Sequence, residues 1–245
     1  MNPHPFPGPS NPDPSGPPPW WVSPRHLAGD DDALADLVGA ALTSAGWRMW
    51  PTARQTLLYV SPDGLCGAEW VRASYPFALG GLPVAWQIAA RSHPTSALRE
   101  WNTYVTCGTP PEAIADFLGA LDARAEPHTP LAGPQAVLEA LTRQGWHRDI
   151  DRPHTAANDP SFTANFSLET VPEHVFDADP RPDLPGWQAW AEPILGAPLW
   201  CATFSASVPH DLVAAFASSL ASSVPVRRQR LPEGTEGHLT LLPPI

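Results

Sequence analysis

The sequence predicts an α+β protein made of two tandem copies of one plan: a helix, four or five antiparallel strands and a second helix, with the copies related by a pseudo-two-fold axis. The first observation is that Ala41–Trp47 recurs in similar form as Ala140–Trp146, 99 positions later. The same spacing relates four further pairs, namely Trp101 and Trp200, Pro110 and Pro209, Phe117 and Phe216, and Leu121 and Leu220. A repeat of about 100 residues has the length of a domain. The connections between candidate strands are too short for parallel crossovers, which favours antiparallel pairing.

The duplication divides the chain into four segments. We expect a disordered Pro-rich tail at residues 1–20, a first domain at 21–126, a divergent second copy at 128–225 and a C-terminal tail at 226–245. Nine prolines between Pro3 and Pro19 leave the first segment little apolar surface to bury against its ordering entropy. We expect it to act as a solubilising tail, with a Pro-motif ligand for a partner as the alternative.

The first copy opens with a helix. Three acids, Asp30–Asp32, supply the N-cap and a negatively charged first turn. Apolar residues then recur at helical spacing, which predicts a buried stripe of Leu34, Leu37, Val38, Ala41, Leu42 and Ala45. Gly46 stands where a helix-ending glycine belongs, and Trp47 is expected to anchor the core at the start of the first strand.

Strands and a closing helix complete this copy. The candidate strands are Trp47–Trp50, Thr56–Val60, Cys66–Arg72, Val84–Arg91 and Trp101–Thr106. Ser61–Gly64 has the composition of a type I turn and predicts a hairpin, whereas Ala73–Pro83 reads as a loop. In the closing helix we expect Thr109 as N-cap and Glu112 as its capping-box partner. Its buried stripe should be Ile114, Phe117, Leu118 and Leu121.

The second copy repeats the plan. A helix is expected over Pro134–Gln144, strands over Ser161–Glu169, Trp187–Leu195 and Trp200–Ser207, and a long acidic loop over Pro172–Gly186. In the first of these strands Phe162, Ala164, Phe166 and Leu168 should alternate inward. The final helix should bury Leu212, Val213, Phe216 and Leu220. Beyond it, Leu239–Leu242 is a candidate edge strand within the tail.

Composition narrows the classes of function. The net charge of −11 argues against nucleic-acid binding, and the absence of lysine excludes a P-loop, which needs one. The basic run Val226–Arg230 is expected to be a solvated segment. The chain has three cysteines, Cys66, Cys107 and Cys201, and no C-x-x-C pair. We therefore expect buried inert thiols without a disulfide or zinc site. Without an apolar run long enough for a membrane span or a signal peptide, the chain is expected to be cytoplasmic.

Catalytic and metal motifs are absent from the sequence, and we expect no cofactor. One candidate site combines His147 and His154 with Asp149, Asp151 and Asp159, which could form a metal or acid–base cluster. This region, or a cleft between the copies, is where an enzyme, for example a hydrolase, would have its site. A second arrangement, Ser23, His26 and Asp30, has the residue types of a catalytic triad.

Tryptophan is the most informative residue type, with 11 in the chain. Trp47, Trp101, Trp146 and Trp200 recur in both copies, so core packing explains them best. The tryptophans without a counterpart are candidates for an exposed binding surface, because exposed indoles mark interfaces. These binding candidates are Trp20, Trp21, Trp50, Trp70 and Trp190.

Four features together resemble a known family. They are the opening Ser23–Gly29, the pair Gly46–Trp47, the turn Ser61–Gly64 and the helix Pro110–Leu121. In these the chain is similar to the actinobacterial, mostly streptomycete, SPDY-type domains of unknown function, whose members often carry two tandem copies. The resemblance covers about 22–225 and is closer in the first copy; Gly64 stands where the Tyr of the motif would be, and the second copy lacks Ser-Pro-Asp. It implies the domain count and carries over no activity or catalytic residue.

These observations favour a non-catalytic, cytoplasmic protein-interaction module whose partner is another protein. An enzyme with a site near His147–Asp159 is the first alternative, and a nucleic-acid-associated protein is the second.

Overall fold

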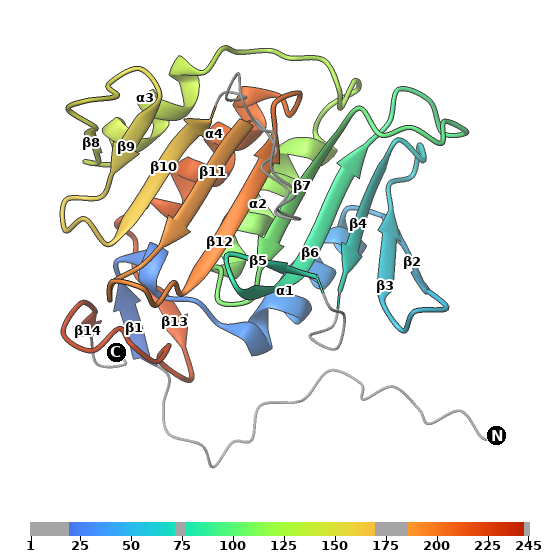
Figure 1. The fold of residues 1–245 in the computed structure, drawn as a ribbon. Helices are drawn as coiled ribbons and strands as arrows, with labels where there is room; N and C mark the ends of the chain where they lie inside the picture. Colours follow the sequence, from blue (N-terminus) through green and yellow to red (C-terminus); the bar gives the residue numbers. More distant parts are fainter. Residues whose placement is uncertain (1–19, 72–76, 170–185, 243–245) are drawn as a thin grey trace.

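The computed structural model describes residues 20–71, 77–169 and 186–242 (Figure 1). The Pro-rich segment 1–19, part of the expected loop Ala73–Pro83 and nearly all of the expected loop Pro172–Gly186 lie outside the described residues.

One antiparallel sheet of 11 strands runs through the molecule. Its strands follow the order β2 (Arg48–Pro51), β3 (Leu57–Val60), β4 (Cys66–Trp70), β6 (Leu82–Ala90), β7 (Trp101–Thr106), β12 (Trp200–Ser205), β11 (Gly186–Ala191), β10 (Ala164–Glu169), β9 (Ala156–Asn158) and β8 (His147–Arg148), with β5 (Ala78–Leu79) paired to β6. The strands of the first half and those of the second half therefore meet at β7 and β12. The mixed α+β class and the antiparallel pairing predicted from the sequence are confirmed.

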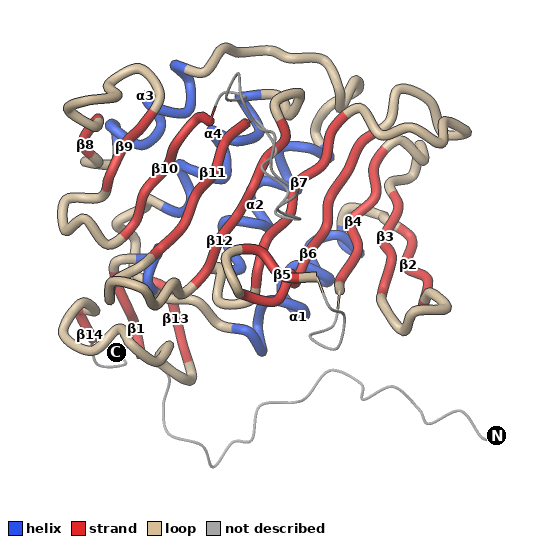
Figure 2. Tube along the Cα trace, viewed as in Figure 1, coloured by secondary structure: helices blue, strands red, loops and turns tan. Residues whose placement is uncertain are grey.

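In the described residues, four α-helices cover one face of this sheet; Figure 2 shows them in blue behind the red strands. They are α1 (Asp31–Ser44), α2 (Pro111–Asp122), α3 (Gln135–Arg143) and α4 (His210–Leu220). Contacts join α1 to α2, α2 to α4 and α4 to α3, so the helices form a row in that order. Phe204 of β12 lies at the middle of the core. Its ring centroid is 5.8 Å from that of Phe117 of α2 and 5.2 Å from that of Phe216 of α4.

Buried indoles anchor the strands to the segments on the helix side. Each of these indole N–H groups donates one hydrogen bond. The pairs are Trp47 to Asp122 Oδ1 (2.7 Å), Trp86 to Leu34 O (3.2 Å), Trp101 to Pro127 O (3.0 Å), Trp187 to His210 Nδ1 (3.0 Å) and Trp200 to His26 O (2.8 Å). Each indole thus fills core volume while its N–H remains satisfied. The prediction that Trp47, Trp101, Trp146 and Trp200 are core residues is confirmed.

A second, three-stranded sheet corrects the expectation for both chain ends. β1 (Trp20–Ser23) pairs with β13 (Val226–Arg228) on one side and with β14 (Thr240–Leu242) on the other. The segment expected as a C-terminal tail therefore contributes two strands, of which β14 matches the candidate edge strand. The ladder also explains why Trp20, placed in the tail by its Pro-rich neighbourhood, is ordered.

Local predictions succeed where neighbouring residues decide the structure. Asp30 caps α1 by accepting from the Ala33 N–H (3.0 Å), and the Ser61–Gly64 hairpin closes with a 2.9 Å backbone hydrogen bond. The buried faces of α2 and α4 are as expected.

Other local predictions are wrong. Leu37 was expected in the buried stripe of α1, but it lies on the exposed side of this helix. The prediction of a loop over Ala73–Pro83 is wrong at Ala78–Leu79, which form β5, and at Leu82–Pro83, which begin β6 and pair with β5.

Two other predictions, the capping box of α2 and the inward-facing Phe162, are wrong. The capping box of α2 does not form: Thr109 Oγ1 donates to Thr106 O, and Glu112 pairs with Arg228. Phe162 is 76% exposed with φ 58° and precedes the strand instead of pointing inward. The Asp159 carboxylate causes this, because it accepts from the N–H groups of Ser161 and Ala164 and shapes a turn.

Candidate binding pocket

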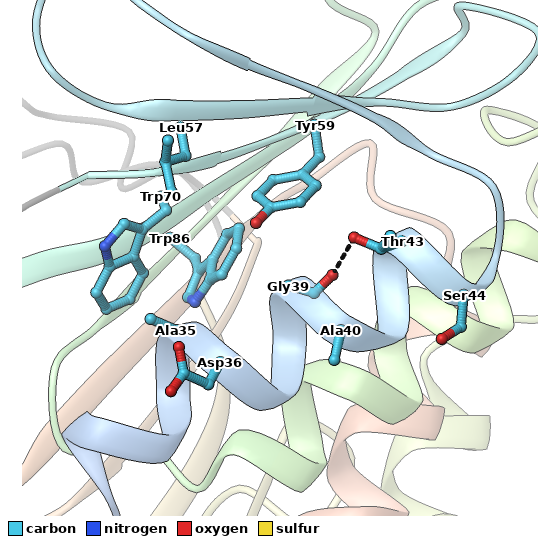
Figure 3. Close-up of a pocket in the computed structure, with 10 residues that line it drawn as sticks. All are labelled: Ala35, Asp36, Gly39, Ala40, Thr43, Ser44, Leu57, Tyr59, Trp70 and Trp86. Atoms are coloured by element: carbon cyan, nitrogen blue, oxygen red, sulfur yellow. Dashed lines mark hydrogen bonds between the residues drawn. The ribbon is translucent and has the colours of Figure 1, made fainter. Parts of the chain in front are cut away.

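A cavity of about 380 Å³ lies between α1 and the helix-facing side of the first half of the sheet (Figure 3). We call it the α1 pocket. Its lining residues are Ala35, Asp36, Gly39, Ala40, Thr43, Ser44, Leu57, Tyr59, Trp70 and Trp86. It exists because the sheet continues from β6 and β4 to β3 and the exposed edge strand β2, whereas in the described part of the chain the row of helices ends at α1.

Three aromatic rings form the wall contributed by the strands. Trp86 is fully buried and held by Leu34 O, and its ring centroid lies 5.3 Å from that of Trp70 and 5.9 Å from that of Tyr59. Trp70 is only half-buried, so part of its indole is open to the pocket. Figure 3 shows these rings projecting from the strands toward α1.

Small residues on α1 give the pocket its depth. Gly39 lies against the aromatic wall: a Cβ there would lie 2.7 Å from the Tyr59 hydroxyl oxygen. A van der Waals contact of that length is repulsive, so the wild-type geometry depends on the absence of a side chain at Gly39. Ala35 and Ala40 leave the space on either side open.

One carboxylate determines the charge of the pocket. Asp36 is exposed at the wall formed by α1, and none of the described lining residues is basic. Burial, and secondarily the negative charge of Asp36, raise the pKa of the Tyr59 hydroxyl, which therefore stays protonated. The Thr43 hydroxyl donates to Gly39 O (2.8 Å; Figure 3). An aromatic cavity with a single acidic group has the chemistry to bind a cation.

The structure separates the five tryptophans predicted to bind. Trp70 lines the α1 pocket. Trp50, opposite Leu58, and Trp190, opposite Cys201, lie in register positions that face away from the helices. Trp20 and Trp21 lie on β1 of the small sheet and, like Trp50, are about 40% exposed.

Two other pocket residues, Asp36 and Tyr59, were not singled out in the sequence. Tyr59 could have been found from the alternation along β3, and Asp36 from its place opposite the apolar stripe of α1. Their proximity depends on how α1 lies across the strands, for which the sequence has no local signal.

The residues of the predicted histidine–aspartate cluster do not converge. His147 and His154 are both exposed, while Asp159 is buried. Asp149 shapes a local turn, and hydrogen bonds, chiefly from the Arg152 N–H, lower the pKa of its carboxyl. Among the described residues no group of three or more His, Cys, Asp or Glu side chains could hold a metal ion.

Ser23, His26 and Asp30, which have the residue types of a catalytic triad, do not form one. Asp30 caps α1, and His26 is buried in the second half of the molecule. There the His26 Nε2 lies 3.2 Å from Thr163 Oγ1 and 3.7 Å from Asp159 Oδ2. Burial lowers the pKa of His26 to about 4, although the Asp159 charge opposes this shift. The imidazole is therefore neutral at pH 7 and its contact with Asp159 is not an ion pair.

Of the three cysteines, Cys66 is buried as expected, whereas Cys107 and Cys201 are half-buried. Burial is the main cause that raises the pKa of Cys66 to about 12 and the pKa values of Cys107 and Cys201 to about 11. All three are free thiols, as the sequence predicts. Their sulfur atoms are protonated and weakly nucleophilic at neutral pH.

Comparison with known families identifies the class of protein. The model of the SPDY domain of unknown function (DUF317) matches residues 60–128 and 172–226, together about half of the chain, and the chain belongs to this family. Trp70 and Trp86 lie in the first matched segment, whereas Asp36, Gly39 and Tyr59 precede it. No curated protein and no solved structure matches the chain. Of the helices in the described residues, none has the length and apolar character needed to cross a membrane.

Proposed function

We propose that this protein is a cytoplasmic, non-catalytic protein-interaction module and that its partner protein binds at the α1 pocket. The observation that carries the proposal is the half-exposed indole of Trp70, which packs against Trp86 in a concave site that Tyr59 also lines. Tryptophan and tyrosine in such pockets are typical centres of protein interfaces, because they bury a large apolar surface and keep a polar group available.

We further propose that residues 21–126 and 128–225 are two copies related by a pseudo-two-fold axis between β7 and β12. The register supports this: Tyr104 pairs with Thr203, which is 99 positions later, and the flanking pairs Val105–Ala202 and Thr103–Phe204 exchange under the same shift. The order of the helices, α1, α2, α4, α3, is also symmetric about this point. Such an arrangement resembles a homodimer in one chain.

Affinity capture from host lysate with a set of pocket variants tests the interaction. Ala40→Arg fills the pocket from an exposed helix position without removing any packing, and Trp70→Leu removes the open indole. We expect a stoichiometric partner that the wild type, Trp70→Phe and Asp116→Asn retain and that Ala40→Arg and Trp70→Leu lose. Asp116 lies exposed on α2, away from the pocket lining.

Each variant must first show the wild-type circular dichroism spectrum and unfolding temperature within a few degrees. If Ala40→Arg and Trp70→Leu both retain as much partner as the wild type, the α1 pocket is excluded as the docking site. If the wild type captures no partner at all, the interaction function itself is wrong.

A further inference from the structure

We propose that the α1 pocket receives the guanidinium group of an arginine side chain on the partner protein. This inference rests on the proposed function and specifies the chemistry that the pocket recognises. Three features of the described residues support it: the sign of the charge, the aromatic wall and the shape of the cavity.

Charge complementarity indicates a cationic occupant. Among the described residues of the lining, Asp36 is the only Asp, Glu, Arg or Lys, and the chain as a whole has a net charge of −11. A carboxylate or phosphate group entering the pocket would meet Asp36 without a compensating cation in the lining. A basic side chain would instead be attracted both by Asp36 and by the overall field.

The aromatic wall adds an attraction that a neutral occupant would not gain. The faces of indole and phenol rings carry negative electrostatic potential, and indole binds cations most strongly. Trp70 is the half-buried indole of this wall; Trp86 packs against it, and Tyr59 packs against Trp86. A cation against Trp70 would also be close to α1, where Asp36 is located (Figure 3).

Shape favours arginine over lysine. The planar guanidinium stacks on aromatic faces and pairs with both oxygens of a carboxylate, whereas an ammonium group is a strongly hydrated point charge. The cavity, at about 380 Å³, is larger than an ammonium group needs and has apolar or small walls at Leu57, Ala35 and Ala40. These walls can pack against the methylene groups of an arginine side chain.

Titration with three small probes tests this inference without the partner. The probes are N-acetylarginine amide, its neutral isostere N-acetylcitrulline amide, and N-acetyllysine amide. Binding is followed by the indole N–H resonance of Trp70, assigned by its absence in Trp70→Phe. We expect saturable binding of the arginine probe, at least threefold tighter than that of the citrulline or lysine probe.

Matched variants then test the role of the carboxylate. Asp36→Asn should weaken binding of the arginine probe roughly threefold to tenfold, the range for one partly exposed charge contact. Asp116→Asn changes the net charge by the same amount and should leave binding unchanged. A weakening by Asp116→Asn equal to that by Asp36→Asn would mean that only the overall charge matters, which would contradict the proposed contact.

The remaining outcomes are equally decisive. Equal binding of arginine and citrulline probes would exclude recognition of the charge, and tighter binding of the lysine probe would exclude the guanidinium. The absence of saturable binding by the arginine probe would also overturn the inference. None of these results affects the capture experiment, in which loss of the partner by Ala40→Arg can still support docking at the pocket.

Discussion

Single atoms decide the shape of the α1 pocket. The Tyr59 hydroxyl occupies space next to α1 that a methyl group at position 39 would require. The ring of Tyr59 cannot move freely, because it packs near Trp86 in the core. The pocket therefore depends on a glycine inside a helix, where alanine would otherwise be preferred by about 1 kcal/mol.

The first prediction concerns this contact. Gly39→Ala should be neutral or destabilising in the wild type, because overpacking, which costs about 1–3 kcal/mol, offsets the gain in helix propensity. In a Tyr59→Phe background the same substitution should stabilise the protein, because the clashing oxygen is gone. Urea denaturation of the four proteins gives the coupling free energy, which we expect to be about 1–2 kcal/mol. Additive effects would show that the Tyr59 hydroxyl does not restrict position 39.

The second prediction concerns His26, whose pKa is lowered from 6.5 to about 4 by burial. Below pH 6.5 the unfolded chain binds a proton at His26, whereas the folded protein does not until the pH nears 4. The free energy of unfolding is therefore highest above pH 6.5 and decreases as the pH falls toward about 4. The full effect corresponds to about 3 kcal/mol. Denaturation from pH 7 to pH 4 should show a smaller loss for His26→Gln than for the wild type. Parallel curves would mean that His26 does not carry this dependence.

At the scale of elements, the segment from Trp20 to Gly29 fastens the two halves together. Arg25 donates to the backbone and hydroxyl of Ser219 at the end of α4, and His26 reaches Thr163. Further along, a side chain at Gly29 would collide with the carbonyl oxygen of Gly108 after β7. The segment precedes the first helix in the chain but makes contacts across the whole molecule.

β13 secures this segment through Arg228, which is 3% exposed. Its guanidinium makes two hydrogen bonds to the Glu112 carboxylate, at 2.7 and 2.6 Å, and its Nε donates to Ala28 O. The arginine thereby joins β13, α2 and the segment that follows β1. The expectation of a solvated basic run is wrong at this residue, although its neighbour Arg227 is exposed.

The third prediction is that Arg228→Ala lowers the free energy of unfolding by about 3 kcal/mol, because it leaves the partly buried Glu112 without its cation. Arg227→Ala is the matched control and should change it by less than about 0.5 kcal/mol. Urea denaturation measures both. Similar small effects of the two substitutions would show that the ion pair does not stabilise the fold.

At the scale of the whole molecule, the two halves share one sheet and one layer of helices. β7 pairs with β12, and α2 packs on α4 directly behind that junction. Phe204 lies at the junction and contacts both helices. This continuity predicts that both halves unfold together in one cooperative transition.

The fourth prediction follows from that continuity. Phe204→Ala should lower the free energy of unfolding by about 3–5 kcal/mol and shift the whole transition, whereas Phe162→Ala, at an exposed position, should have an effect below about 0.5 kcal/mol. Tryptophan fluorescence and far-ultraviolet circular dichroism should report the same midpoint. Two separate midpoints would show that the halves unfold independently.

The sequence by itself determined several of the helices and strands. β7 spans Trp101–Thr106 as predicted, and the buried residues of α2 and α4 follow the helical spacing of their apolar side chains. The cap of α1 and the hairpin at Ser61–Gly64 are likewise determined locally. These features follow from the sequence because periodicity, capping and turn chemistry involve residues a few positions apart.

Only the tertiary structure decided which distant groups meet. It pairs Glu112 with Arg228 instead of Thr109, places His26 beside Asp159, and joins β1 to β13 and β14. It also brings Asp36 of α1 under Tyr59 and Trp70, which creates the pocket that only one predicted tryptophan lines. Such contacts depend on how well whole elements pack against one another, and that free energy is spread over the core instead of being encoded in a local pattern.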